Sequence, residues 1–277
     1  MKTDSIAQSV CRNLIILLGI LVVLSGCKST KKESTDAAGP AEETTKKEDL
    51  IQELTSYPLP TAYEITDMLH EAGASYILTL SNPASKVGNY ISSAEKALNL
   101  GVYGTDLSYA STYMMKQETM RYLESSKKLI DELEISTAFN VSYAERVESN
   151  LDTRDSLITI ISDSFIDTWD YLVQNEEDKL AILVVSGSYI EGLYITTQIA
   201  ITAADNTPFL EVIAHQKKSL GTLIGIIEPI KEDADMADIY KSLIDLAEIY
   251  EEVGETLTTG QLEKVLSVID PLRESIV

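Results

Sequence analysis

The chain has 277 residues, and its 44 acidic side chains against 22 basic ones give a formal net charge of −22 at pH 7. Such a surface repels the phosphates of nucleic acids and anionic lipid headgroups, so we expect no binding to nucleic acid. The sequence has only two cysteines and two histidines, and it contains no phosphate-binding loop or metalloprotease motif. No cofactor is therefore evident from the composition.

The N-terminus has the order of features that is typical of a bacterial lipoprotein signal peptide. Lys2 and Arg12 precede an apolar run at residues 14–24, which leads into Leu24-Ser25-Gly26-Cys27. The run is shorter than the roughly 20 residues that span a bilayer, so it indicates a processed signal. The last four residues resemble the lipobox, whose cysteine receives fatty acyl chains such as palmitate. We expect a signal peptide at residues 1–26 and a lipid anchor on Cys27, while an ordinary secretory signal with a chance cysteine is the alternative.

The residues after Cys27 predict where the anchored protein resides. Lys28 follows the cysteine where aspartate would favour inner-membrane retention, by resemblance to enterobacterial sorting. Residues 28–33 are net basic, whereas surface lipoproteins of Bacteroidota usually carry an acidic stretch there. We therefore expect the outer membrane and its periplasmic face, with surface exposure as the alternative. Because Cys11 leaves with the signal and Cys27 is acylated, neither a disulfide nor a thiolate zinc site is expected.

The remainder of the chain divides into a tether and one helical domain. Residues 28–48 contain no large apolar side chain, so residues 27–48 are predicted to be the lipidated cysteine and a flexible tether. Apolar residues at three- and four-residue spacing continue through residues 49–277, and no alternation of period two persists. We expect an all-α domain of eight or nine helices in a bundle or in stacked antiparallel hairpins. The predicted helices span residues 62–80, 92–115, 117–133, 141–148, 152–174, 179–204, 208–230, 236–253 and 261–275.

Two of these helices are unusually apolar. Asp106 is the only charge between Lys96 and Lys116, and Glu191 is the only charge between residues 179 and 205. Helices of this kind are buried on most sides, so we expect both to be central core helices. The second is long enough to suggest a membrane span, but its Ser, Thr, Gln and Gly content argues against one.

The centres of the two apolar helices share a pattern. The segment 106–112 (DLSYAST) aligns with 191–197 (EGLYITT), and glycines lie near both acids, at Gly101, Gly104, Gly187 and Gly192. Glycine costs about 1 kcal/mol in a helix, so its use indicates close backbone approach or room for another group. A weak internal duplication is one explanation of the match, and chance similarity is the other.

The two lone acids are the candidate functional residues. In one interpretation they are core acids, each hydrogen-bonded to a tyrosine or hydroxyl one turn away, because a buried acid is costly without a partner. In the other, both face one pocket between the two helices, which suits a small polar or cationic ligand. The side chains predicted to line this pocket beside Asp106 and Glu191 are Tyr103, Tyr109, Tyr113, Tyr189, Tyr194, Ser111, Thr112, Thr196 and Thr197. Two carboxylates can also serve an oxygen-ligated metal or glycoside hydrolysis, but no cleft or further ligands are evident in the sequence.

Several segments resemble an uncharacterised group of helical lipoproteins from Bacteroidota, over most of residues 58–230. The segments are 97–103 with 106–109, Arg154-Asp155-Ser156 with Ser162-Asp163-Ser164, and Glu191-Gly192-Leu193-Tyr194. The resemblance implies an all-α fold and supplies no mechanism. We therefore expect a membrane-anchored, periplasm-facing domain that binds a small ligand or metal. A non-catalytic scaffold or envelope-assembly partner is the alternative, and a carboxylate-dependent hydrolase is the second alternative.

Overall fold

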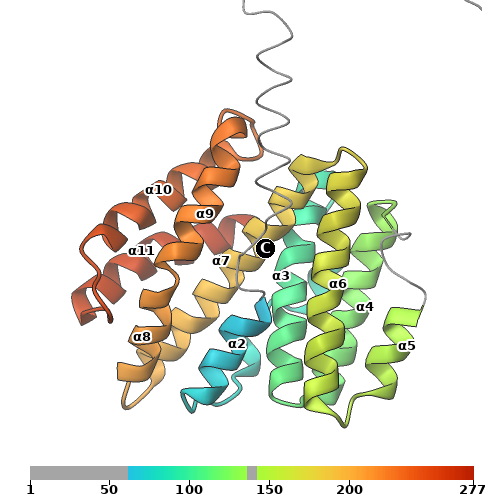
Figure 1. The fold of residues 1–277 in the computed structure, drawn as a ribbon, viewed down its shortest axis with the longest axis horizontal. Coiled ribbons are helices and arrows are strands. Elements are labelled where there is room, and N and C mark those ends of the chain that lie inside the picture. The colour runs from blue at the N-terminus through green and yellow to red at the C-terminus, as the bar shows by residue number, and fades with distance from the viewer. Residues whose placement is uncertain (1–61, 136–141) are drawn as a thin grey trace, which may run out of the picture. The chain divides into compact units, whose positions relative to one another are not determined.

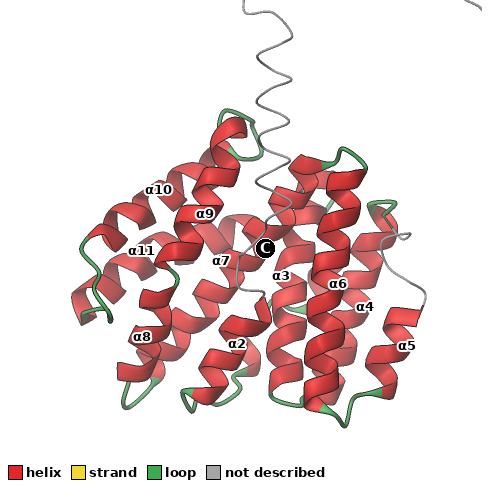
Figure 2. Ribbon diagram, in the orientation of Figure 1, coloured by secondary structure: helices red, strands yellow, loops and turns green. Residues whose placement is uncertain are grey.

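The computed structural model describes residues 62–135 and 142–277 (Figure 1). These residues form ten α-helices and no strand (Figure 2), which confirms the all-α prediction. The predicted signal peptide, Cys27, the tether and the first residues of the predicted helical domain, up to Thr61, lie outside the described residues. The helices are α2 (Ala62–Glu71), α3 (Ser93–Thr112), α4 (Lys116–Glu132), α5 (Ser142–Ser149), α6 (Arg154–Gln174), α7 (Asp178–Thr202), α8 (Thr207–His215), α9 (Lys217–Ile227), α10 (Ala237–Glu251) and α11 (Thr259–Ile276).

Helices α3 and α7 form the centre of the domain, with α4 to α6 on one side and α8 to α11 on the other (Figure 1). Their backbones touch. A Cβ atom added to Gly101 would lie 1.9 Å from the carbonyl oxygen of Val184, and one added to Gly187 would lie 2.0 Å from that of Leu98. No side chain fits either place, so these two glycines allow the close approach that the sequence indicated.

Helix α7 is long and apolar enough to cross a membrane by length and composition, with a mean hydropathy of 1.4 in its most apolar window. However, 83% of that window is buried inside the domain. The packing of α7 against α3, α8 and α11 accounts for its apolar character, which confirms the prediction of a core helix.

The first predicted helix is shorter than expected, since α2 ends at Glu71 instead of continuing to Leu80. Gly73 has φ = +85°, a left-handed conformation that favours glycine. The amide of Ala74 donates to the carbonyl of Leu69, and that of Gly73 donates to the carbonyl of His70. This pair of hydrogen bonds is the Schellman motif, which ends the helix despite the apolar residues that follow.

The predicted helix at 208–230 is divided into α8 and α9, which raises the number of helices to ten. The Gln216 side chain donates to the carbonyl oxygen of Val212, the acceptor that a regular helix would offer to the Gln216 amide. The next carbonyl, that of Ile213, accepts the hydroxyl of Tyr250 from α10 at 2.8 Å. Side-chain donors thus compete with the helical hydrogen bonds at this point.

Residues 74–92 connect α2 to α3 and contain two short 3-10 turns, Leu78–Leu80 and Ala84–Gly88. We call them the cover segment because they run along α3. Three α3 side chains at three-residue spacing hold them. Tyr109 accepts the amide of Ile77 at 2.9 Å, Asp106 accepts that of Asn82 at 3.0 Å, and Tyr103 donates to the carbonyl of Pro83 at 3.0 Å. The spacing places these side chains on one face of α3.

Candidate functional site

The two lone acids of the central helices lie beside each other in the protein interior. Asp106 on α3 and Glu191 on α7 are both 0% exposed. Burial is the main cause that raises the pKa of each, and the charge of Glu191 raises the pKa of Asp106 further. A hydrogen bond with the Asp106 side chain acts in the opposite direction on the pKa of Glu191. The close packing of α3 on α7 thus brings the two carboxyl groups to one place.

Arg273 on α11 is the partner of Glu191. Its Nε donates to Oε2 at 2.9 Å and its Nη2 donates to Oε1 at 3.0 Å, a bidentate pairing. Nη2 also lies 3.4 Å from the carbonyl oxygen of Leu80 in the cover segment. The guanidinium carbon is 4.5 Å from the ring centre of Tyr194, within cation–π range. Helix α11 therefore joins α7 and the cover segment at the acid pair.

Sequence reasoning missed Arg273, although a signal for it exists. The buried stripe of α11 includes Leu262, Val265 and Ile269. Arg273 follows Ile269 by four residues and Leu262 by eleven, so it shares their face of the helix. A cation on a buried stripe needs a buried anion, and the chain has two lone acids in apolar helices.

Asp106 has a different environment from that of Glu191. Its Oδ2 accepts the backbone amide of Asn82, while its Oδ1 is buried and has no hydrogen-bond partner among the described residues. Burial, followed by the charge of Glu191, raises the pKa of Asp106 well above its ordinary value, against the effects of Ser81, Asn82 and Arg273. The Arg273 guanidinium balances Glu191, and the raised pKa of Asp106 favours its neutral, protonated form, so the centre carries no net charge when Asp106 holds its proton.

Four buried oxygen atoms near Asp106 lack hydrogen-bond partners in the described structure. They are the Tyr76 hydroxyl, Ser81 Oγ, Asn82 Oδ1 and Asp106 Oδ1. The Ser81 hydroxyl lies close enough to lower the pKa of both Asp106 and Tyr76, although it meets hydrogen-bond geometry with neither. Proteins pair most buried polar groups, and four of the buried side-chain atoms that lack a hydrogen-bond partner in the described residues belong to Asp106 and the adjoining cover segment. We call these four atoms the oxygen cluster.

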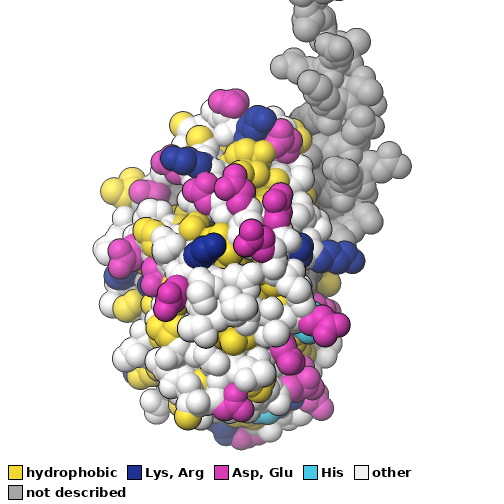
Figure 3. All heavy atoms as spheres, turned by 90° about the vertical axis from the view of Figure 1, so that its left-hand side faces the viewer, with side chains coloured by type: hydrophobic (Ala, Val, Ile, Leu, Met, Phe, Trp, Pro, Cys, Tyr) yellow, Lys and Arg dark blue, Asp and Glu magenta, His cyan; other side chains and the backbone are white. Residues whose placement is uncertain are grey.

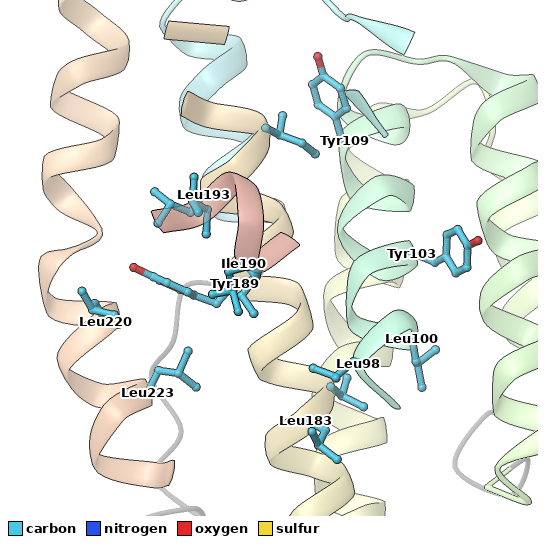
Figure 4. Close-up of a cluster of buried hydrophobic side chains, with 14 of the residues drawn as sticks. Leu98, Leu100, Tyr103, Tyr109, Leu183, Tyr189, Ile190, Leu193, Leu220 and Leu223 are labelled. Atoms are coloured by element: carbon cyan, nitrogen blue, oxygen red, sulfur yellow. The ribbon is translucent and has the colours of Figure 1, made fainter. Parts of the chain in front are cut away.

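Two of the predicted pocket tyrosines point away from the interface of α3 with α7. Figure 4 shows Tyr103 directed toward α4 and Tyr189 directed to the opposite side, toward Leu220 and Leu223 of α9. The Tyr103 ring lies 6.2 Å from that of Tyr122 on α4, between ring centres. Tyr103 and Tyr189 therefore do not line one common pocket.

The other three predicted tyrosines are also engaged by neighbours. The Tyr109 hydroxyl binds the cover segment, and the Tyr113 ring packs edge-on against the Tyr109 ring with 5.2 Å between centres. Tyr76 of the cover segment joins them at 4.7 Å from the Tyr109 ring centre. Tyr194 lies under the Arg273 guanidinium. These tyrosines therefore contact separate neighbours and do not line one shared pocket.

The four predicted hydroxyls are satisfied mainly within their own helices. Thr112 donates to the carbonyl of Ser108 at 2.9 Å, Thr196 to that of Gly192 at 2.7 Å and Thr197 to that of Tyr194 at 2.8 Å. Ser111 bonds the hydroxyl of Thr119 on α4 at 3.5 Å. Their hydrogen bonds therefore do not converge on the acids.

The geometry bears on the alternatives for the acid pair. Neither acid bonds a tyrosine or hydroxyl one turn away on its own helix, since Glu191 pairs with Arg273 and Asp106 accepts the Asn82 amide. Both carboxyl groups are fully buried, whereas a hydrolase presents its carboxylates to a substrate. No group of three or more His, Cys, Asp or Glu side chains in the described residues could hold a metal ion.

A separate cavity of about 20 Å³ involves the middle of α3 and is large enough for about one water molecule. It is lined by Leu100, Gly104, Leu107, Ser126, Tyr143, Ser164, Phe165, Thr168 and Val184. Neither Asp106 nor Glu191 belongs to its lining.

Comparisons with family models, curated proteins and solved structures gave no match to this chain.

Proposed function

We propose that this protein is a lipid-anchored envelope protein that binds a small polar ligand at Asp106 and does not catalyse a reaction. The single observation that carries the proposal is the oxygen cluster. A buried oxygen without a hydrogen-bond partner costs about 1–3 kcal/mol, so four of them favour a bound ligand that supplies the missing interactions. Since all four atoms can accept hydrogen bonds or donate lone pairs, the ligand is a hydrogen-bond donor or a cation.

The cover segment supports this proposal because it forms one wall of the centre. It contributes Ser81, Asn82 and Tyr76, and it lacks regular helix apart from its two short turns. A few side-chain hydrogen bonds to α3 and α11 fasten it. Irregular segments open locally at lower free-energy cost than core helices, so this wall is the natural route for a ligand to enter.

The exposed surface does not favour the scaffold alternative. The large hydrophobic side chains that are exposed in the described residues are few, and only the first two share a segment: Leu78 and Ile91 of the cover segment, Met115, Ile166 and Ile201. Figure 3 shows one face of the molecule, on which hydrophobic, acidic and basic side chains are interspersed. Hydrophobic residues scattered in this way are ordinary on a protein surface, whereas a docking site needs a contiguous patch.

The lipid anchor is proposed from the sequence alone, on the lipobox that ends at Cys27. Labelling cells with an alkyne analogue of palmitate tests it. We expect incorporation into the wild-type chain and none into Cys27→Ala, and the wild-type protein should fractionate with the outer membrane. An unlabelled wild-type chain in the soluble fraction would contradict the anchor without affecting the ligand proposal.

Native mass spectrometry of the full chain, released from the membrane in mild detergent, tests ligand binding. We expect a non-covalent mass on the wild-type protein that is absent from Asp106→Asn. Asp163→Asn is the matched control, because it removes the same charge from an exposed position on α6. A bare polypeptide mass for the wild-type protein, equal to that of the variant after sequence correction, would refute the proposal.

A further inference from the structure

We infer that the ligand at the oxygen cluster is a monovalent metal cation of the sodium or potassium class. This inference rests on the proposed function, since it names the ligand of the same centre. It follows from the type of donor atoms, the fixed orientation of one amide and the local charge.

The donors are all oxygen atoms. They comprise one carboxylate oxygen of Asp106, the hydroxyls of Ser81 and Tyr76, and the amide oxygen of Asn82. Oxygen-only sets suit hard cations, whereas softer transition metals recruit imidazole or thiolate ligands. Ser81 and Asn82 are 5% and 0% exposed, so these donors form an interior site instead of a surface one.

The orientation of Asn82 is fixed by a chain of hydrogen bonds. The Asn99 amide nitrogen donates to the carbonyl oxygens of Glu95 at 3.0 Å and Ile276 at 2.6 Å, so Asn99 Oδ1 is the remaining acceptor. Asn82 Nδ2 donates to that oxygen at 3.4 Å and to the Tyr90 hydroxyl at 2.8 Å. Because backbone carbonyls only accept, this chain leaves Asn82 Oδ1 as an acceptor without a donor.

The charges of Asp106, Glu191 and Arg273 favour a ligand with a single positive charge. The bidentate contact with Arg273 balances Glu191. Among the residues that the structure describes, the only hydrogen bond that Asp106 accepts is from the backbone amide of Asn82, which carries no charge. Burial favours the protonated form of Asp106, so a monovalent ion that displaces this proton to solvent keeps the centre without net charge, whereas a divalent ion leaves one buried positive charge and usually needs more carboxylates.

Such an ion would connect the cover segment to α3. Asp106 belongs to α3, while Ser81, Asn82 and Tyr76 belong to the cover segment. Binding therefore stabilises the closed position of this wall, and local opening exposes the site. With ordered water or a neutral polar molecule in place of the ion, local opening of this wall would not depend on the salt cation.

Amide hydrogen exchange of the cover segment in the full-length protein is the test. It is measured in NaCl, in KCl and in N-methyl-D-glucamine chloride at equal ionic strength. We expect saturable slowing by Na⁺ or K⁺, reaching about 100-fold when the ion is at 100 times its dissociation constant. The slowing should be absent in Ser81→Ala and Asp106→Asn and retained in Asp163→Asn. Ser81→Ala removes one oxygen ligand of the proposed ion and changes no buried ionisable group, so the test does not depend on the folding of Asp106→Asn.

The outcomes separate this inference from the proposed function. Equal exchange in the three salts, together with a ligand mass that Asp106→Asn loses, would overturn the cation and leave the proposed function standing. Equal exchange together with a bare polypeptide mass would overturn both. Slowing by Na⁺ or K⁺ that Ser81→Ala retains would overturn the placement of the ion at the oxygen cluster.

Discussion

The ion pair between Arg273 and Glu191 should be among the most sensitive points of the domain. In Arg273→Met, Glu191 stays fully buried and loses both hydrogen bonds of the guanidinium. Removing one partner of a buried pair costs about 3–5 kcal/mol, because the other charge stays buried without compensation. We expect a loss of this size in the free energy of unfolding, measured by urea denaturation with circular dichroism.

The reciprocal and double variants test the reasoning behind that magnitude. Glu191→Met should cost less than Arg273→Met, because the Arg273 side chain is 11% exposed and can retain water. The double variant should be more stable than Arg273→Met, since replacing both charges by apolar groups of similar volume is often nearly neutral. Lys264→Met is the control for an exposed charge on α11. Arg273→Met at wild-type stability, or a double variant that is less stable than it, would refute the account.

Three further predictions concern the rest of the domain. Gly101→Ala should destabilise the domain by more than about 3 kcal/mol in urea unfolding, because the new Cβ meets a backbone oxygen. Gly221→Ala, which has open space around it, should stabilise the domain by up to about 1 kcal/mol. Equal effects of the two substitutions would contradict the close helix packing. Burial raises the pKa of Tyr109 to about 12, so the unfolded state loses the hydroxyl proton at lower pH than the folded state does. The free energy of unfolding therefore falls as pH rises from about 10 to 12, by at most about 3 kcal/mol. Tyr109→Phe should flatten this alkaline limb of the stability curve, and an unchanged limb would contradict it. Hydrogen bonds from the amides of Ser92 and Ile91 lower the pKa of Glu95, so its stabilising effect is present above its ordinary pKa and is lost as pH falls through the lowered one. Glu95→Gln should reduce the loss of helicity on acidification, and an identical acid transition would contradict this role of Glu95.

The sequence was sufficient to predict the central helices and their two acids, because a lone charge in a long apolar helix is visible without knowledge of contacts. It also indicated close helix approach through Gly101 and Gly187. It could not give the direction of Tyr103 or Tyr189, since α3 and α7 are buried on nearly all sides and apolar periodicity then has no preferred face.

Other features depend on contacts between distant parts of the chain. Arg273 lies 82 residues from Glu191 in an ordinary amphipathic helix, so only the fold brings the pair together. The break between α8 and α9 needs the Tyr250 hydroxyl from another helix. The early end of α2 is a local effect, and Gly73 was its available signal.

A crystal structure of the full-length protein grown in rubidium chloride would test the central claim most directly. We expect density for a bound group within contact distance of Asp106 Oδ1 and Ser81 Oγ, with an anomalous signal from rubidium if the ligand is a monovalent cation. Density for a non-ionic molecule there would retain the binding proposal and exclude the ion. Density for protein and water alone, with the four oxygens bonded to one another or to water, would contradict the claim that this centre binds a ligand.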